Sequence, residues 1–188
     1  MPASVPSTPS AAAANFDLDE LVACARYNDL DGLIELVDTY RAAHPEVSLR
    51  ELYSLSLPNS HSTALHQAAA NGCLPILKHI LPAMSPANIN ATNADGSTAL
   101  HWAALNGKLD CVELLLQCGA DATIKNDLGR SPSTVAEQQG HMDVVNALLK
   151  SFEPEESGDE EETIKAVEKA AGEVAAREAA GAGEPGAK

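Results

Sequence analysis

The clearest apolar pattern lies in the centre of the chain, where it has the spacing of a short helix. One helix face, with steps of three, three and one residues, is formed by Leu109, Val112, Leu115 and Leu116. The small residues of 98–106 predict another short helix just before it, and Thr98 can cap the first turn with its hydroxyl. Gly107 separates the two segments and predicts a helix end in the left-handed conformation. The pattern therefore predicts a helix-turn-helix unit.

The same unit recurs along the chain. Residues 63–72 match residues 98–107 closely at an offset of 35, and a degraded third copy occupies 131–141. Towards the N-terminus, 24–30 has the same shape with Asn28 in the glycine position. Asparagine is the next most tolerant residue of the left-handed conformation. This period and its Thr-Ala-Leu-His motif are those of ankyrin repeats.

The repeats predict an all-α protein, an ankyrin-repeat solenoid of about four helix-turn-helix repeats with short projecting turns over 16–150. About nine extra residues lie between the first and second units, which predicts a long, partly helical finger over 42–60. End units need a more polar outer face because no neighbour covers it. Ser133 and Thr134, in place of the Leu-His pair, fit that role in the last unit.

Composition changes at both ends of the repeats. The segment 1–15 is rich in Pro, Ser and Ala, and 151–162 is an acidic linker; both are expected to be disordered. The tail over 163–188 is rich in Ala and Glu and predicts a marginal helix, with apolar positions at Ile164, Val167, Ala171 and Val174.

Each of these two segments has two possible interpretations. The acidic linker is either a solubilising segment or an anionic arm that shields a basic partner. The tail helix either forms on a partner or has no function. Ser157, which is followed by acidic residues, is a candidate phosphorylation site for an acidophilic kinase.

Charge and cysteine content narrow the class of partner. The chain has 27 acidic and 12 basic residues, a net charge of −15, which argues against direct binding to nucleic acid or to an anionic membrane and favours a basic protein as the partner.

No apolar run is long enough to span a membrane. The four cysteines lack the spacing of zinc ligands. They are expected to be small buried residues in a reducing compartment, the cytoplasm or nucleus.

Two histidines are the main candidates for chemistry. His66 and His101 occupy the same repeat position, so they could share a metal ion or relay a proton. In the ankyrin pattern this imidazole instead bonds the backbone of the neighbouring turn, and a repeated histidine without a third ligand does not make a metal site. No catalytic triad or phosphate-binding glycine loop is present. We therefore expect no enzyme activity, no cofactor and no metal.

Solenoid geometry points to the residues that bind a partner. Turn tips and the ends of the first helices line one surface of such a solenoid. The binding candidates are Arg26, Tyr27, Asn71, Asp95, Ser97, Trp102, Leu105, Asn106 and Asp127. Further positions on the same surface are Ser60, Ser62, Ala70, Leu128, Arg130, Gln138 and Gln139. Trp102 is either an interior residue or a binding anchor. Leu105 is predicted to be an exposed apolar residue at a variable tip.

The details of the repeats resemble one family more closely than ankyrin proteins in general. The segment 105–110 in the third unit, the four-unit length and the acidic tail with its Ala/Glu-rich end are similar to the fungal ankyrin-repeat chaperones dedicated to one ribosomal protein. That resemblance implies an escort that binds the N-terminal segment of the KH-domain small-subunit protein at the mRNA entry channel. It also implies a monomer that forms a heterodimer with its client and moves between cytoplasm and nucleus. A signalling or transcription-regulating ankyrin adaptor is the alternative.

Overall fold

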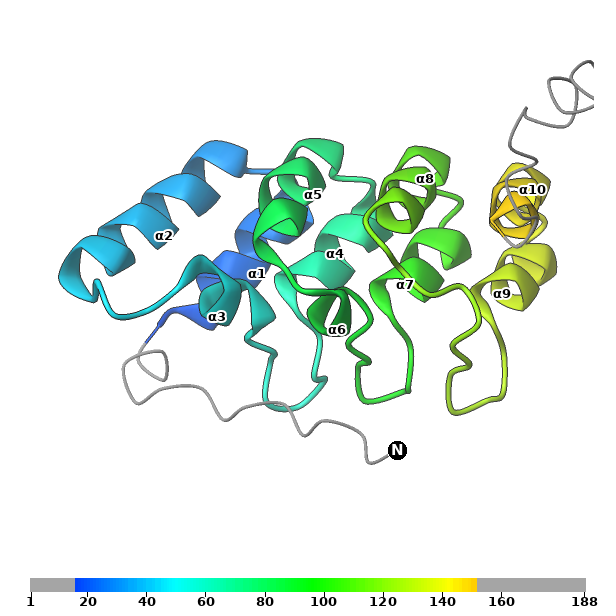
Figure 1. Ribbon diagram of the computed structural model, residues 1–188, viewed down its shortest axis with the longest axis horizontal. Coiled ribbons are helices and arrows are strands. Elements are labelled where there is room, and N and C mark those ends of the chain that lie inside the picture. Colours follow the sequence, from blue (N-terminus) through cyan, green and yellow to red (C-terminus); the bar gives the residue numbers. More distant parts are fainter. Residues whose placement is uncertain (1–15, 152–188) are drawn as a thin grey trace, which may run out of the picture. The chain divides into compact units, whose positions relative to one another are not determined.

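Paired helices stack side by side in two layers in the computed structural model, which describes residues 16–151 (Figure 1). The first layer consists of α1 (Leu18–Tyr27), α4 (Ala64–Asn71), α7 (Ala99–Leu105) and α9 (Pro132–Gln139). The second layer consists of α2 (Leu30–Ala43), α5 (Leu74–Ile80), α8 (Leu109–Gln117) and α10 (Met142–Lys150). Each first-layer helix packs on the next one along the chain. The predicted all-α ankyrin solenoid is confirmed.

Short polar motifs begin and end these helices as the sequence predicts. Thr98 caps α7 by accepting a hydrogen bond from the backbone N–H of His101, whose ring in turn accepts one from the Thr98 N–H. Asn28 ends α1 with φ 60° and ψ 33°, a left-handed conformation that few residues other than glycine adopt readily. Gly107 follows α7 with φ 61°. Local sequence therefore sets both ends of the repeat's first helix.

The core is thin and is built from small residues in the first layer. Its fully buried alanines are Ala25, Ala64, Ala68, Ala69, Ala99, Ala103, Ala104 and Ala136. Because alanine has no side chain beyond Cβ, neighbouring first-layer helices can approach closely. Larger buried side chains come from both layers: Leu21, Leu65 and Leu100 from the first, and Leu33, Leu77, Leu115 and Leu148 from the second. Together they form one continuous cluster through all four units.

Three turns of chain lead into the first-layer helices and project on one side of the molecule (Figure 1). We name them the first finger (55–63), the second finger (90–98) and the third finger (120–131). A backbone hydrogen bond of 2.9 Å from Ala94 N to Ser60 O joins the first finger to the second. The fingers thus form a continuous wall beside the first layer.

The extra residues between the first two units contain a short helix. Over 42–60 the chain leaves α2, forms α3 (Leu49–Ser54) and enters the first finger. Tyr53 on α3 is fully buried, and its hydroxyl lies 3.0 Å from Nε2 of His79 on α5. Burial raises the pKa of Tyr53 to about 12. The next connection contains the 3₁₀ turn η2 (Leu81–Ala83) and α6 (Pro86–Ile89).

The cysteines do not all behave as the sequence predicts. Cys24, Cys73 and Cys111 are buried and free, as expected, and burial raises the pKa of the Cys111 thiol to about 11. Cys118 is also free but only partly buried, so the prediction that all four are buried is wrong. It lies just after α8, where the chain turns out of the second layer towards the third finger.

The two tails fall outside this description. The segments 1–15 and 163–188, and nearly all of the acidic linker, lie beyond the described residues, so their predicted disorder and helix stay predictions. Within residues 16–151, no helix is both long and apolar enough to cross a lipid bilayer.

Candidate binding groove

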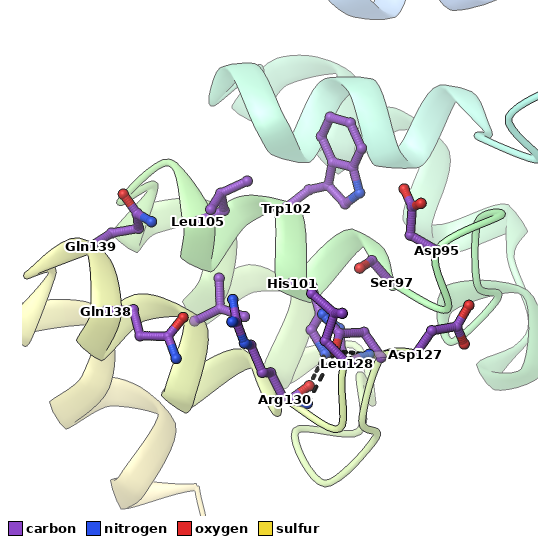
Figure 2. Close-up of a pocket in the computed structure, with 12 residues that line it drawn as sticks. Asp95, Ser97, His101, Trp102, Leu105, Asp127, Leu128, Arg130, Gln138 and Gln139 are labelled. Atoms are coloured by element: carbon purple, nitrogen blue, oxygen red, sulfur yellow. Dashed lines mark hydrogen bonds between the residues drawn. The ribbon is translucent and has the colours of Figure 1, made fainter.

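A groove of about 370 Å³ lies between α7, α9 and the second and third fingers (Figure 2). Its lining combines apolar, amide and charged side chains from four segments of the chain. The lining residues are Asp95, Ser97, His101, Trp102, Leu105, Asn126, Asp127, Leu128, Arg130, Val135, Gln138 and Gln139.

The middle of the groove is apolar. Trp102 is half-buried on α7, and Leu105, one turn later on the same helix, is 41% exposed. Leu128 on the third finger is 72% exposed, and the buried Val135 lies on α9. Trp102 therefore faces the groove instead of being enclosed in the core. Large aromatic side chains in this setting are the usual anchors of protein interfaces.

Hydrogen bonds hold the third finger against α7. The His101 ring accepts a hydrogen bond at Nδ1 from the Thr98 N–H, so its other nitrogen carries the proton and donates to the Arg130 carbonyl over 3.0 Å. The Asn126 side chain accepts hydrogen bonds from the backbone N–H groups of Leu128 and Arg130. One wall of the groove is thus fixed before any partner arrives, which lowers the entropy cost of binding.

The same arrangement occurs one repeat earlier. The His66 ring accepts a hydrogen bond from the Thr63 N–H and donates to the Ser97 carbonyl over 3.1 Å. Burial lowers the pKa of His66 to about 4 and also lowers the pKa of His101. The prediction that these imidazoles bond the neighbouring turn is confirmed. No group of three potential metal ligands occurs within residues 16–151.

Charged groups stand at two separate places on the rim. Asp95 and Asp127 lie at the tips of neighbouring fingers, where the Asp127 N–H donates to the Asp95 carbonyl over 3.1 Å. Arg130 extends from the third finger towards Gln138, away from both carboxylates (Figure 2). All three charged side chains are exposed, and no ion pair joins them. They are available to a partner.

The groove brings together five of the nine residues predicted from sequence to bind a partner: Asp95, Ser97, Trp102, Leu105 and Asp127. Of the seven further positions, Ser60, Ser62 and Ala70 do not line it, and Ser62 and Ala70 are buried, so they do not lie on an exposed surface as predicted. The other four, Leu128, Arg130, Gln138 and Gln139, do line it. Their convergence agrees with a shared surface, and the binding role of each residue stays a prediction.

The other four predicted residues lie outside the groove. Arg26 donates from Nε to the Gln67 side chain over 3.4 Å, and Tyr27 beside it is 76% exposed on α1. Asn71, the last residue of α4, and Asn106, which follows α7, each donate from the side chain to the carbonyl of the residue four positions earlier. These asparagine side chains satisfy carbonyl groups at the helix ends, which gives them a structural role.

Two lining residues were missed by the sequence analysis. Asn126 repeats Asn93 of the second finger, where the same side chain accepts from the N–H groups of Asp95 and Ser97. The asparagine repeated at this position in both fingers could have identified Asn126 from the sequence. Val135 carries no local signal, because it looks like an ordinary core residue of α9. Ser157, the candidate phosphorylation site, lies outside the described residues.

The stacked helix pairs and the open groove define a class of protein, the repeat solenoids that bind other proteins. A family model described as ankyrin repeats matches residues 21–126 and 65–159, and the chain belongs to the ankyrin-repeat family. This agrees with the period found in the sequence.

Particular relatives are more informative. The chain is 40% identical over 156 residues to the ankyrin repeat-containing protein YAR1 of Saccharomyces cerevisiae, an alignment covering 78% of this chain and 75% of that protein. It is 35% identical over 150 residues to an ankyrin repeat-containing protein of Schizosaccharomyces pombe, covering 77% and 95%.

A solved structure also matches closely. It is the crystal structure of the yeast ribosomal protein Rps3 in complex with its chaperone Yar1, with a TM-score of 0.65 and 40% sequence identity, covering 74% of this chain and 95% of the matched chain. The resemblance to fungal ankyrin-repeat chaperones seen in the sequence is confirmed.

Proposed function

We propose that this chain is a dedicated chaperone that binds a newly made basic ribosomal protein of the small subunit and keeps it soluble until ribosome assembly. The observation that carries the proposal is the likeness, over most of the chain, to a chaperone crystallised with its ribosomal protein client. The client is the KH-domain protein at the mRNA entry channel, held by its N-terminal segment in a one-to-one heterodimer.

The groove suits such a client physically. A basic ribosomal protein exposes lysine and arginine side chains that later contact RNA, and it exposes apolar surface that later meets other subunits. The groove offers an apolar middle at Trp102, Leu105 and Leu128, flanked by the carboxylates of Asp95 and Asp127. Apolar burial supplies affinity, and complementary charge raises the association rate and selects the partner.

The mechanism is stoichiometric binding without chemistry. The two repeated histidines are occupied by backbone hydrogen bonds, so they hold the fingers and have no free role in proton transfer. We infer that the chain is not an enzyme, and that it accompanies its client in both the cytoplasm and the nucleus. Imaging of a fluorescent fusion tests the second point, and exclusion from the nucleus at all times would contradict it.

A pull-down of the full chain followed by mass spectrometry tests the function. We expect one small-subunit ribosomal protein to dominate the bound fraction. The double variant W102A/L105A should weaken binding about 30-fold, because interface anchors contribute about 2 kcal/mol or more when buried by a partner. The matched control is M142A/L149A, which removes two exposed apolar side chains, 55% and 53% accessible, from α10 outside the groove.

Two results would overturn the proposal. If the dominant partner is a kinase or a transcription factor, the chain is a regulatory adaptor. If W102A/L105A binds the ribosomal protein as tightly as M142A/L149A does, the groove is not the binding surface.

A further inference from the structure

The two acidic fingertips of the groove act as one charged feature. Asp95 and Asp127 belong to successive fingers, and the backbone hydrogen bond from Asp127 N to Asp95 O joins their main chains. The Asp127 carboxylate accepts no hydrogen bond within residues 16–151, and Asp95 receives only a long one, 3.4 Å, from the Asn93 side chain. Neither carboxylate forms an ion pair within residues 16–151, so both can attract a positively charged group of a partner.

Gly96 leaves room for the close approach of Asp127 to the second finger. This glycine has φ 69°, and a Cβ built on it would collide with the Asp127 carboxylate. The carboxylate therefore lies directly over the backbone of the preceding finger, where any other residue would displace it. This close approach places an acidic group where the second and third fingers meet.

Arg130 gives the groove a positive charge at some distance from the two carboxylates. Its guanidinium extends towards Gln138 on α9, whereas Asp95 and Asp127 lie on the far side of Leu128 (Figure 2). No ion pair joins Arg130 to any carboxylate in the described part of the chain. The groove consequently has an acidic end at the fingertips, an apolar middle, and a basic, amide-rich end near Arg130 and Gln138.

We propose that this polarity selects the client segment and sets its direction. The occupant is an amphipathic helical segment of the client with a lysine or arginine against Asp95 and Asp127. Its apolar residues lie on Trp102 and Leu105, and a carboxylate or its free C-terminal carbonyl groups face Arg130. The inference rests on the proposed function for the identity of the client. It adds which charged residues of the groove recognise the client helix and in which orientation that helix binds.

The electrostatics of helices support this direction. The N-terminal end of a helix carries a partial positive charge and its C-terminal end a partial negative charge. A client helix whose N-terminal end lies at the carboxylates and whose C-terminal end lies at Arg130 gains at both ends, and the reversed helix loses at both. Like charges brought together at an interface act strongly against the wrong partner or orientation.

Charge variants of the full chain test the inference against the client ribosomal protein, with binding followed by biolayer interferometry. D95N/D127N neutralises the acidic end with little change of shape. Its matched control, D110N/E113Q, changes the net charge equally at two exposed residues of α8 in the second layer. We expect D95N/D127N to weaken binding about tenfold in about 0.1 M salt, and less in about 1 M salt, where screening extends over only about 3 Å. The control should change it less than threefold.

Reversing the basic end gives the sharper test. R130E makes the chaperone more acidic, so attraction to a basic client by net charge alone predicts tighter binding. The polarity inferred here predicts weaker binding, by about tenfold. The matched control is K125E, which makes the same charge change at an exposed residue of the same finger that does not line the groove. Circular dichroism spectra of all four variants check that the fold is retained.

The outcomes separate this inference from the proposed function. If the unaltered chain does not bind the ribosomal protein, the proposed function fails. If it binds but D95N/D127N has the same affinity as D110N/E113Q, the acidic end does not contribute to recognition of the client. If R130E binds as tightly as K125E or more tightly, the proposed direction is wrong. Loss of affinity in both groove variants, with both controls unaffected, supports the inference.

Discussion

Protonation of His66 should destabilise the fold in mildly acidic solution. The ring is 1% exposed, and its neutral form makes two hydrogen bonds, one accepted from Thr63 and one donated to Ser97. A protonated ring could no longer accept the bond from Thr63. Burial lowers the pKa of this group to about 4 from an ordinary value of 6.5. His66 thus has a lower proton affinity in the folded than in the unfolded chain.

The sign and size of the effect follow from that difference. The contribution of His66 to stability is fully present above pH 6.5, decreases as the pH falls below it, and is lost below about pH 4. With about 1.36 kcal/mol for each pKa unit, the whole contribution is about 3 kcal/mol, of which about 2 kcal/mol is lost between pH 7.5 and pH 5. His101, whose pKa is also lowered by burial, adds a loss of the same sign.

Urea unfolding followed by circular dichroism, at several values between pH 7.5 and pH 5, measures this loss. The variant H66N removes the titrating ring, so its free energy of unfolding should change with pH about 2 kcal/mol less than that of the unaltered chain. H61N is the control, because His61 is exposed and its φ of 52° suits asparagine. Equal pH dependence in the unaltered chain and H66N would refute the reasoning.

Three further predictions concern the helix ends and the insertion. G107A should destabilise the chain by about 2 kcal/mol and G140A by about 1 kcal/mol, as measured by urea unfolding. Both glycines have positive φ, but a Cβ at Gly107 would lie 2.6 Å from the His141 ring, whereas the space at Gly140 is open. Asn28→Gly should leave the melting temperature nearly unchanged, and Asn28→Ala should cost about 1 kcal/mol, because alanine disfavours the left-handed conformation; equal effects would contradict this. Tyr53→Phe should cost about 1 kcal/mol through the lost hydrogen bond to His79, and no change on thermal unfolding would show that water replaces it equally well.

Much of the repeat could be predicted from the sequence because its signals are local. The left-handed end at Asn28, the cap at Thr98 and the helix-turn-helix period each depend on residues within one or two turns of each other. Even the role of His101 followed from the repeat pattern. The partial exposure of Cys118 could not be predicted, because it depends on where the chain leaves α8 relative to the next unit.

The candidate groove shows what required the tertiary structure. Sequence alone identified Asp95, Trp102 and Asp127 as candidates, but it gave no distance between fingers and left open whether Trp102 faces the interior or a partner. Stacking of successive units brings the fingertips together through the Asp127–Asp95 backbone bond, turns Trp102 into the groove and separates Arg130 from both carboxylates. Local sequence therefore determined the repeat and its ends, because their hydrogen bonds form within each unit. The packing between units decided the groove and its polarity, because the groove forms between segments that are distant along the chain.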